Sequence, residues 1–182
     1  MNNKIFVAYN TDSIVESLIS SHHKKFGNLK KKVKNECGNL IEKVEEEAHV
    51  PSTLNDSIDV QAVSDQKSEL RKKVFKIIKK YYGVKGGIYE LYFDILDDSW
   101  TSQSLVRHYE KNNIAIKNSS FIISIIADDE TSFWQLQEIY FASYYNKPIL
   151  YLRTEKFLKL VAKGKLDKKI GRWKKKKKIS IQ

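Results

Sequence analysis

The chain has 182 residues, of which 41% are hydrophobic, so it is long enough and apolar enough to build one domain with a buried core. Two prolines and seven glycines exclude a collagen-like chain and argue against a disordered, low-complexity one. The formal net charge of +11 favours an anionic partner such as nucleic acid, although lysine runs on helices also occur as ordinary solvated surface.

The single cysteine, Cys37, excludes a disulfide framework within the chain and fits a reducing compartment, so we expect a cytoplasmic protein. No apolar run approaches the roughly 20 residues that a membrane-spanning helix needs. Residues 1–4 lead directly into a strand-like run rather than into a signal peptide. We therefore expect neither a membrane partner nor a secretory leader.

The first predicted element is a strand over residues 4–9, which carry the apolar run Ile-Phe-Val-Ala-Tyr. Polar residues follow at 10–13, and apolar residues then recur at helical spacing over residues 14–19. Ligands of open α/β sheets bind at the carboxyl ends of the strands, so the loop at residues 10–13 is a candidate ligand loop.

Residues 24–70 differ in character, because Lys and Glu dominate and no strand-like run appears. Apolar residues at helical spacing from Leu29 to Val44 predict one amphipathic helix, and residues 50–56 break it. We predict a helical insertion that projects from the domain as an arm or a dimerisation surface. The alternative is a flexible loop with a little helix.

A second helix is predicted over residues 65–82, with Gly83 as its stop. After a turn at two glycines, residues 88–95 predict a strand, followed by an acidic loop at residues 97–102 and a helix at residues 103–111.

The unit around which the chain is organised runs from residue 119 to residue 152. Residues 121–126 form a short apolar run typical of a strand buried on both faces. Ser132 is the candidate cap of a helix that ends before Pro148, and residues 149–152 predict another buried strand. Strand, helix and strand in succession make one βαβ unit.

A final helix is predicted over residues 155–163, before a basic segment rich in lysine. Strands that alternate with helices predict an α/β fold, with a mostly parallel sheet, helices on both faces and the helical insertion. We assign residues 1–155 to the α/β domain and residues 156–182 to a C-terminal helix and a basic tail.

Glu138 is the candidate catalytic residue, because it is an acid on the aromatic stripe of its predicted helix, one turn after Trp134. A carboxylate just beyond a buried strand can stabilise an oxocarbenium-like centre or attack it, and both routes break a bond to the anomeric carbon of ribose. Trp134 and Tyr9 are candidates for stacking on a base or a nicotinamide ring. The alternative is that Glu138 is an exposed helix acid and Trp134 a core anchor.

Several other chemistries have no support in the sequence. No phosphate-binding glycine loop, dinucleotide fingerprint or nucleophile elbow occurs. The four histidines lack metal-ligand spacing with Cys, Asp or Glu, so we predict no metal site and no bound cofactor.

Several segments together resemble a Toll/interleukin receptor (TIR) domain, which has a flavodoxin-like fold. Residues 4–12 are similar to the first strand and loop of that family, residues 92–94 to its second strand, and residues 118–126 to its third. Residues 133–139 resemble the segment in which NAD-cleaving TIR domains carry a tryptophan and, one turn later, the catalytic glutamate. Residues 147–150 match the start of the fourth strand. The resemblance covers roughly residues 4–20 and 88–153.

The resemblance implies a substrate and a set of roles. Glu138 would be the catalytic carboxylate of an NAD hydrolase or cyclase, with NAD as substrate rather than cofactor, in microbial defence or signalling. The protein would act as a homo-oligomer. The residues that the resemblance places around the substrate are Tyr9, Asn10, Asp94, Trp100 and Trp134.

Three other functions stay open. Nucleoside 2-deoxyribosyltransferases also place a nucleophilic glutamate early in a helix that ends in Lys-Pro before a buried strand, and residues 138–148 resemble that pattern. A TIR-like domain without catalysis would serve as an adaptor or a nucleotide sensor. The lysine-rich tail at residues 174–178 would bind nucleic acid weakly, with a steep dependence on salt.

Overall fold

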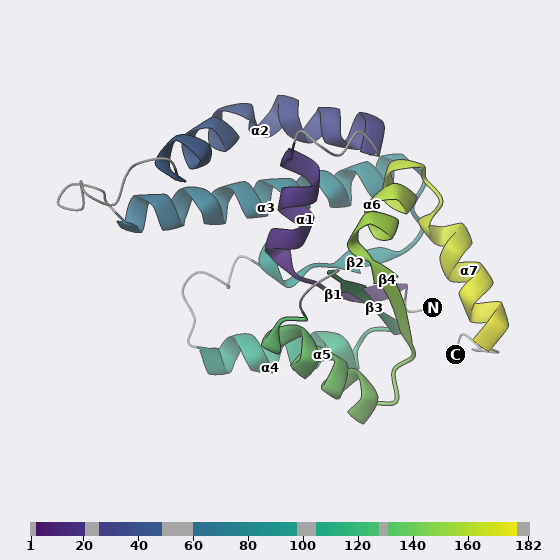
Figure 1. Ribbon diagram of the computed structural model, residues 1–182. Coiled ribbons are helices and arrows are strands. Elements are labelled where there is room, and N and C mark those ends of the chain that lie inside the picture. Colours follow the sequence, from purple (N-terminus) through teal and green to yellow (C-terminus); the bar gives the residue numbers. More distant parts are fainter. Residues whose placement is uncertain (1–2, 21–25, 49–59, 98–104, 128–130, 178–182) are drawn as a thin grey trace.

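The computed structural model describes residues 3–20, 26–48, 60–97, 105–127 and 131–177. Within these ranges the chain forms a parallel four-stranded sheet between two layers of helices (Figure 1). The strands are β1 (Lys4–Ala8), β2 (Glu90–Tyr92), β3 (Phe121–Ile126) and β4 (Ile149–Arg153). The helices are α1 (Thr11–Ile19), α2 (Gly27–Ala48), α3 (Val60–Val84), the 3-10 turn η3 (Asp94–Leu96), α4 (Leu105–Lys117), α5 (Phe133–Tyr144), α6 (Thr154–Ala162) and α7 (Leu166–Lys177).

The sheet has the strand order β2-β1-β3-β4, and every pair is parallel. Phe6 at the centre of β1 is in register with Tyr92 of β2 on one side and with Ile122 of β3 on the other. The predicted α/β fold of flavodoxin type is therefore confirmed. The helix that follows β1 and the helix that follows β3 lie on opposite faces, so a crevice is expected where these two strands end.

The side chains of β1 alternate between two cores, because successive residues of a strand point to opposite faces. Ile5 and Val7 belong to the larger core, which α1, α2, α3, α6 and α7 cover. Phe6 and Ala8 belong to the smaller core, which α4 and α5 cover. A sheet buried on both faces explains why β1 and β3 read as continuous apolar runs.

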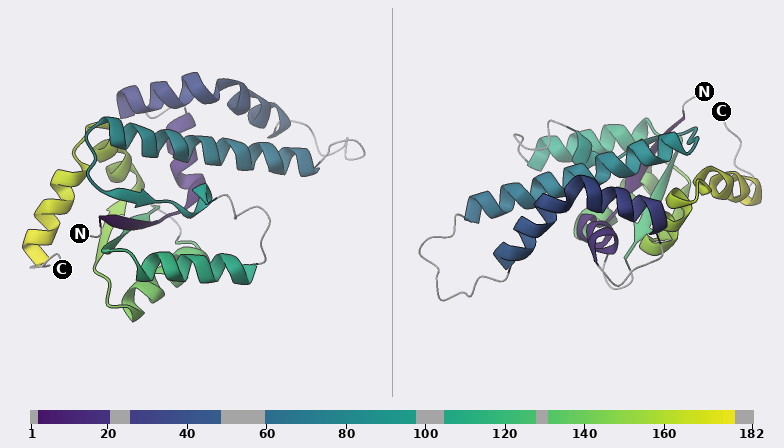
Figure 2. Two further views of the ribbon diagram at one scale, coloured as in Figure 1. Left: turned by 180° about the vertical axis from the view of Figure 1, so that it is seen from behind. Right: turned by 90° about the horizontal axis from the view of Figure 1, so that it is seen from above.

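The predicted insertion contains α2 and the first part of α3, which lie side by side and extend beyond the sheet (Figure 2). Leu29, Val33 and Cys37 of α2 are fully buried in the larger core. Burial raises the pKa of the Cys37 thiol. The first half of α2 is thus part of the domain core, and only the far end of the helix pair projects as an arm.

The end of α3 differs from the prediction, because the helix continues through Gly83 to Val84. Gly86 has a φ of 80°, and its N–H donates to the Gly83 carbonyl at 2.9 Å. The N–H of Gly87 donates to the Tyr82 carbonyl at 3.1 Å. This pair of bonds is a Schellman motif, so the left-handed residue that stops the helix is Gly86.

The unit predicted over residues 119–152 is present with small differences at its ends. The Ser132 hydroxyl accepts a hydrogen bond from the Gln135 N–H at 3.2 Å, which confirms Ser132 as the cap of α5. The preceding helix α4 continues to Lys117, six residues beyond its predicted end. The preceding strand β2 has only three residues instead of the predicted eight, because η3 begins at Asp94.

The basic segment after α6 forms a further helix, α7, which the sequence did not predict. Leu166 and Ile170 are buried in the larger core, and the Trp173 ring lies 5.3 Å from the Phe121 ring. Lys174 is also buried, and its Nζ lies 4.5 Å from the centre of the Phe121 ring. Apolar contacts therefore fix α7 against the domain although most of its other residues are basic.

Candidate functional site

Glu138 lies in the second turn of α5 and is buried, with 8% of its surface exposed. Its Oε1 accepts a hydrogen bond from Asn112 Nδ2 of α4 at 3.0 Å. Burial and the negative charge of Asp94 raise the pKa of the Glu138 carboxyl well above its ordinary value, and the bond from Asn112 offsets part of that rise. Glu138 is therefore a buried acid, and Trp134, which is 45% exposed, lies at the surface. This is the reverse of the alternative, in which Glu138 is an exposed helix acid and Trp134 a core anchor.

A polar network connects Glu138 to the ends of β1 and β2. Asn112 Nδ2 lies 3.5 Å from Asp94 Oδ2, in addition to its bond to Glu138. Asp94 Oδ1 accepts hydrogen bonds from the Tyr9 hydroxyl at 2.5 Å and from the Ile95 N–H at 2.9 Å. The network thus joins side chains of η3, α4 and α5 with that of Tyr9, the residue after β1, as expected for groups held in a fixed arrangement.

Tyr9 is the residue of this network whose side chain packs in the larger core. Burial, together with the neighbouring charge of Asp94, raises the pKa of Tyr9 well above its ordinary value, so the hydroxyl remains a hydrogen-bond donor. The ring packs 4.6 Å from the Phe75 ring and 5.6 Å from the Phe93 ring in the larger core. Tyr9 therefore acts on the site through Asp94, and its ring is not placed to stack on a substrate.

A hollow of about 230 Å³, which includes space open to solvent, lies beside this network. Its lining comes from α4 and α5 and consists of Tyr109, Asn112, Trp134, Gln137, Glu138 and Phe141. Most of this volume is open to solvent, and the enclosed part, about 10 Å³, has room for about one water molecule, so the hollow is a shallow depression beside Glu138. Asn112 Oδ1 is buried and has no hydrogen-bond partner among the described residues, so it is an unsatisfied acceptor on a residue that lines the hollow.

Gln135 fixes the start of α5 to the sheet. Its fully buried side chain donates through Nε2 to Ser124 Oγ at 3.1 Å and to the Ile125 carbonyl at 2.7 Å. Because Glu138 follows Gln135 by less than one turn, these two bonds also fix the position of the carboxyl. A carboxyl on a helix that is tied to a central strand can be held precisely enough for chemistry.

The predicted site residues are distributed unequally around this hollow. Glu138 and Trp134 line it, while Asp94 and Tyr9 reach it only through Asn112. Asn10 has a different role, because its side-chain oxygen caps α1 by accepting a bond from the Ser13 N–H at 3.2 Å. Trp100 lies outside the described residues.

The sequence did not predict a role for Asn112, which contacts both acids of the site. A signal for it exists. Ala115 and Ile116 are buried on the inner face of α4, and Asn112 precedes them by three and four positions. A polar residue on a buried helix stripe needs a polar partner. The predicted helix ended at residue 111, however, so Asn112 was not placed on that stripe.

Two other features of the described residues bear on the class of protein. No three or more His, Cys, Asp or Glu side chains lie together there in a group that could hold a metal ion. In the same part of the chain, no helix combines the length and the apolar character required to cross a bilayer.

Comparisons with protein-family models, with curated proteins and with solved structures found no match to this chain. The fold and the site therefore define only a class: an α/β domain of flavodoxin type in which a buried carboxyl and amide lie beside a small hollow. The resemblance to TIR domains stays a prediction.

Proposed function

We propose that this protein is a TIR-like enzyme that cleaves the N-glycosidic bond of NAD. The observation that carries the proposal is the environment of Glu138, a buried carboxyl with a raised pKa that lines a hollow beside a partly exposed indole. Buried acids with perturbed pKa values occur preferentially at functional sites. Both features also agree with the glycosidic chemistry that the sequence suggests.

The nicotinamide ring of NAD carries a positive charge, which would favour the ionised form of Glu138 when the substrate binds. As the bond between the ribosyl carbon and the nicotinamide nitrogen breaks, its electron pair moves to that nitrogen and neutral nicotinamide leaves. The positive charge passes to the ribosyl carbon, where the Glu138 carboxylate stabilises it or bonds to it. Water then adds to this carbon and loses a proton, which yields ADP-ribose.

The other residues of the site have supporting roles in this proposal. Asn112 Nδ2 orients the Glu138 carboxylate, and its unpartnered Oδ1 accepts a hydrogen bond from a ribose hydroxyl. The Trp134 indole stacks on the nicotinamide ring. Asp94 and Tyr9 are positioning residues, since Asp94 contacts Asn112, Tyr9 donates to Asp94, and neither lines the hollow.

Release of nicotinamide from NAD by the purified protein tests the proposal. We expect turnover by the wild type and a loss of about 10²–10³ in kcat for Glu138→Gln, which is the usual effect of removing one group that stabilises transition-state charge. Glu16→Gln, at an exposed position of α1, is the matched control and should retain full activity. Equal activity in Glu138→Gln and the wild type would overturn the mechanism.

A 2′-deoxynucleoside distinguishes the rival glycosidic chemistry. Release of the base from this substrate, with none from NAD, would assign the chain to the deoxyribosyltransferase reaction.

The surface of α5 supports a second candidate function, a module that assembles without catalysis. Four aromatic side chains of this helix are between 45% and 71% exposed, and Leu136 lies among them. The aromatic residues are Phe133, Trp134, Tyr140 and Tyr144. At about 200 Å² per ring, they expose roughly 500 Å², a large part of the approximately 800 Å² that each partner of a stable complex buries.

The exposed surface of α5 carries no charge, because the one charged residue of this helix, Glu138, is buried. Two copies of this surface can therefore pack together without repulsion between like charges, which favours a second copy of the chain as the partner. Light scattering of the wild type and of Tyr140→Lys tests this candidate. A dimer or larger oligomer that Tyr140→Lys dissociates, with no NAD turnover in either protein, would favour the assembly module. A monomeric wild type would exclude it.

A further inference from the structure

The net charge of the chain is confined to its C-terminal end. Residues 156–182 contain twelve Lys or Arg residues and one acid, so they hold the entire net charge of +11. Residues 1–155 contain 21 Lys or Arg residues and 21 Asp or Glu residues, and are therefore neutral overall. The excess charge thus belongs to one segment of the chain, residues 156–182.

Most of these cations project from two ordered helices. Nine of them in α6, α7 and the turn between the two helices are exposed, and none is paired with an acid among the described residues. The nine are Lys156, Lys159, Lys163, Lys165, Lys168, Arg172, Lys175, Lys176 and Lys177. Together they form what we call the basic surface. The remaining described cations of this segment are half-buried Lys169 and buried Lys174.

The single acid of residues 156–182 is Asp167, and its hydrogen bonds are with residues outside this segment. Asp167 accepts a hydrogen bond from the Tyr82 hydroxyl through Oδ1 and one from the Ile88 N–H, at 3.0 Å, through Oδ2. These two bonds turn the carboxylate toward the end of α3 and the start of β2. Asp167 therefore forms no ion pair with the described cations of the basic surface.

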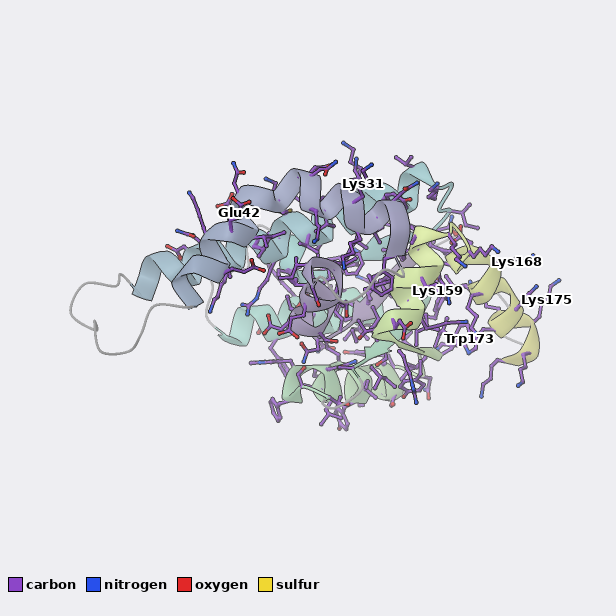
Figure 3. The ribbon with its side chains drawn as sticks, turned by 45° about the horizontal axis from the view of Figure 1, so that its top comes forward. Lys31, Glu42, Lys159, Lys168, Trp173 and Lys175 are labelled. Carbon is purple, nitrogen blue, oxygen red and sulfur yellow. The ribbon has the colours of Figure 1, made fainter. Side chains whose placement is uncertain are left out.

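Helix α7 presents its cations in a regular array. Lys168, Arg172 and Lys175 are spaced four and three residues apart, which places them on one face of the helix. Figure 3 shows Lys168 and Lys175 on the outer side of α7 and Trp173 on its inner side. At 1.5 Å per residue the twelve residues of α7 extend over about 18 Å, long enough to follow several phosphates of a nucleic-acid backbone.

Helix α2 gives a contrast, because its lysines are balanced by acids. Over Gly27–Ala48 it contains five Lys and five Glu residues, and Figure 3 shows Lys31 and Glu42 on the same helix. Lys32 pairs with Glu36 on the next turn at 3.0 Å. Alternating signs of this kind are typical of a solvated helix face, whereas α6, α7 and the turn between them carry the nine exposed cations and one exposed acid, Glu155.

The chemistry of the basic surface favours nucleic acid over a lipid bilayer. A helix that lies in a membrane needs an exposed apolar face. The apolar face of α7 is already used, because Leu166 and Ile170 are buried and Trp173 packs on Phe121. No large apolar side chain of α6 or α7 is exposed among the described residues. The basic surface therefore has no apolar side chain to insert into a bilayer, and charge is the feature through which it can bind a partner.

The same absence of exposed aromatic side chains on α6 and α7 distinguishes between forms of nucleic acid. Proteins that bind single strands stack bases on exposed aromatic rings. A strongly basic surface without such rings matches the regular phosphates of a double helix, which are contacted without regard to sequence. We propose that the basic surface of α6 and α7 binds the phosphate backbone of double-stranded nucleic acid without sequence specificity.

Fluorescence anisotropy of a labelled 20-base-pair DNA duplex, titrated with the full chain between 50 and 200 mM salt, tests the proposal. If about five of the nine cations each neutralise one phosphate, the plot of log K against log salt has a slope of about −4.5, and affinity falls about 500-fold over this range. An RNA duplex and duplexes of other sequence should bind with similar affinity.

Two variants with equal loss of charge locate the surface. Replacing Lys168, Arg172 and Lys175 with glutamine removes three phosphate contacts, so the slope should become shallower by about 2.7. The matched control replaces Lys31, Lys34 and Lys43 of α2, which are also exposed, and should leave the slope and the affinity unchanged. All six positions are exposed, so both variants should unfold at the temperature of the wild type.

Four results would overturn the proposal. They are the absence of duplex binding at 50 mM salt, a wild-type slope shallower than about −1, an equal loss of affinity in the two triple variants, and tighter binding to vesicles of anionic lipid than to the duplex. The last result would identify a membrane surface as the partner instead. None of these outcomes depends on whether Glu138 cleaves NAD.

Discussion

Replacing Glu138 with glutamine keeps the size of the side chain and an oxygen that can accept the hydrogen bond from Asn112, but it removes the ionisable carboxyl. In the native protein, burial and the charge of Asp94 raise the pKa of Glu138 well above the ordinary value of about 4.3. At a pH between the ordinary pKa of Glu138 in the unfolded chain and its raised pKa in the folded protein, the folded protein retains a proton that the unfolded chain releases. The substitution abolishes this difference.

The sign and the magnitude follow from proton linkage. A group whose pKa rises on folding contributes stability that is fully present below the unfolded pKa and is lost as the pH rises through the folded pKa. Within that window the wild type loses up to about 1.4 kcal/mol of unfolding free energy per pH unit relative to Glu138→Gln. For a chain of this size, 1 kcal/mol corresponds to about 2–4 °C in Tm, so the Tm difference widens by up to about 3–6 °C per pH unit.

Thermal unfolding followed by circular dichroism from pH 4 to pH 8 measures this difference. We expect the Tm of Glu138→Gln to rise relative to that of the wild type as the pH increases above about 4.3. Glu16→Gln, at an exposed position of α1, should follow the wild type at every pH. A Tm difference for Glu138→Gln that stays constant from pH 4 to pH 8 would refute the assignment of a raised pKa to the buried carboxyl.

Three other substitutions test separate parts of the structure. Asn112→Ala removes the hydrogen bond that lowers the pKa of Glu138, so the pH window of the stability difference should extend upward; an unchanged window would contradict the role of Asn112. Tyr9→Phe removes the hydroxyl that donates to Asp94 at 2.5 Å and should cost about 1–3 kcal/mol in urea unfolding, whereas a cost near zero would show that this bond is not needed. Leu29→Ala, at a fully buried position of α2, should cost about 2–5 kcal/mol, and a cost below about 1 kcal/mol would place α2 outside the cooperative core.

The parts of the fold that the sequence predicted well depend on local signals. The strand β3 has the predicted bounds of 121–126, because an apolar, β-branched run flanked by polar residues needs no distant partner to be recognised. Ser132 likewise caps the helix that begins at the next residue. The alternation of strands and helices then leads directly to the parallel sheet.

The parts that the sequence did not predict depend on contacts between distant residues. Strand β2 ends early because the Asp94 side chain accepts the Ile95 N–H and a bond from Tyr9, 85 positions away in the chain. Helix α7 was not predicted because lysines dominate its sequence. Its few apolar residues are recognised as core residues only once they are seen to pack on the sheet. In the same way, nothing local links Asn112 to Glu138, which lies 26 residues further along the chain.

The pH dependence of kcat/KM for NAD cleavage is the most direct test of the central claim, that the buried carboxyl of Glu138 performs the chemistry. This ratio reports the pKa values of the free protein. We expect a rate that rises with pH, with a midpoint well above the ordinary pKa of a glutamate, and we expect this rise to disappear in Glu138→Gln. Absence of nicotinamide release at every pH, or an identical profile in the variant, would contradict it.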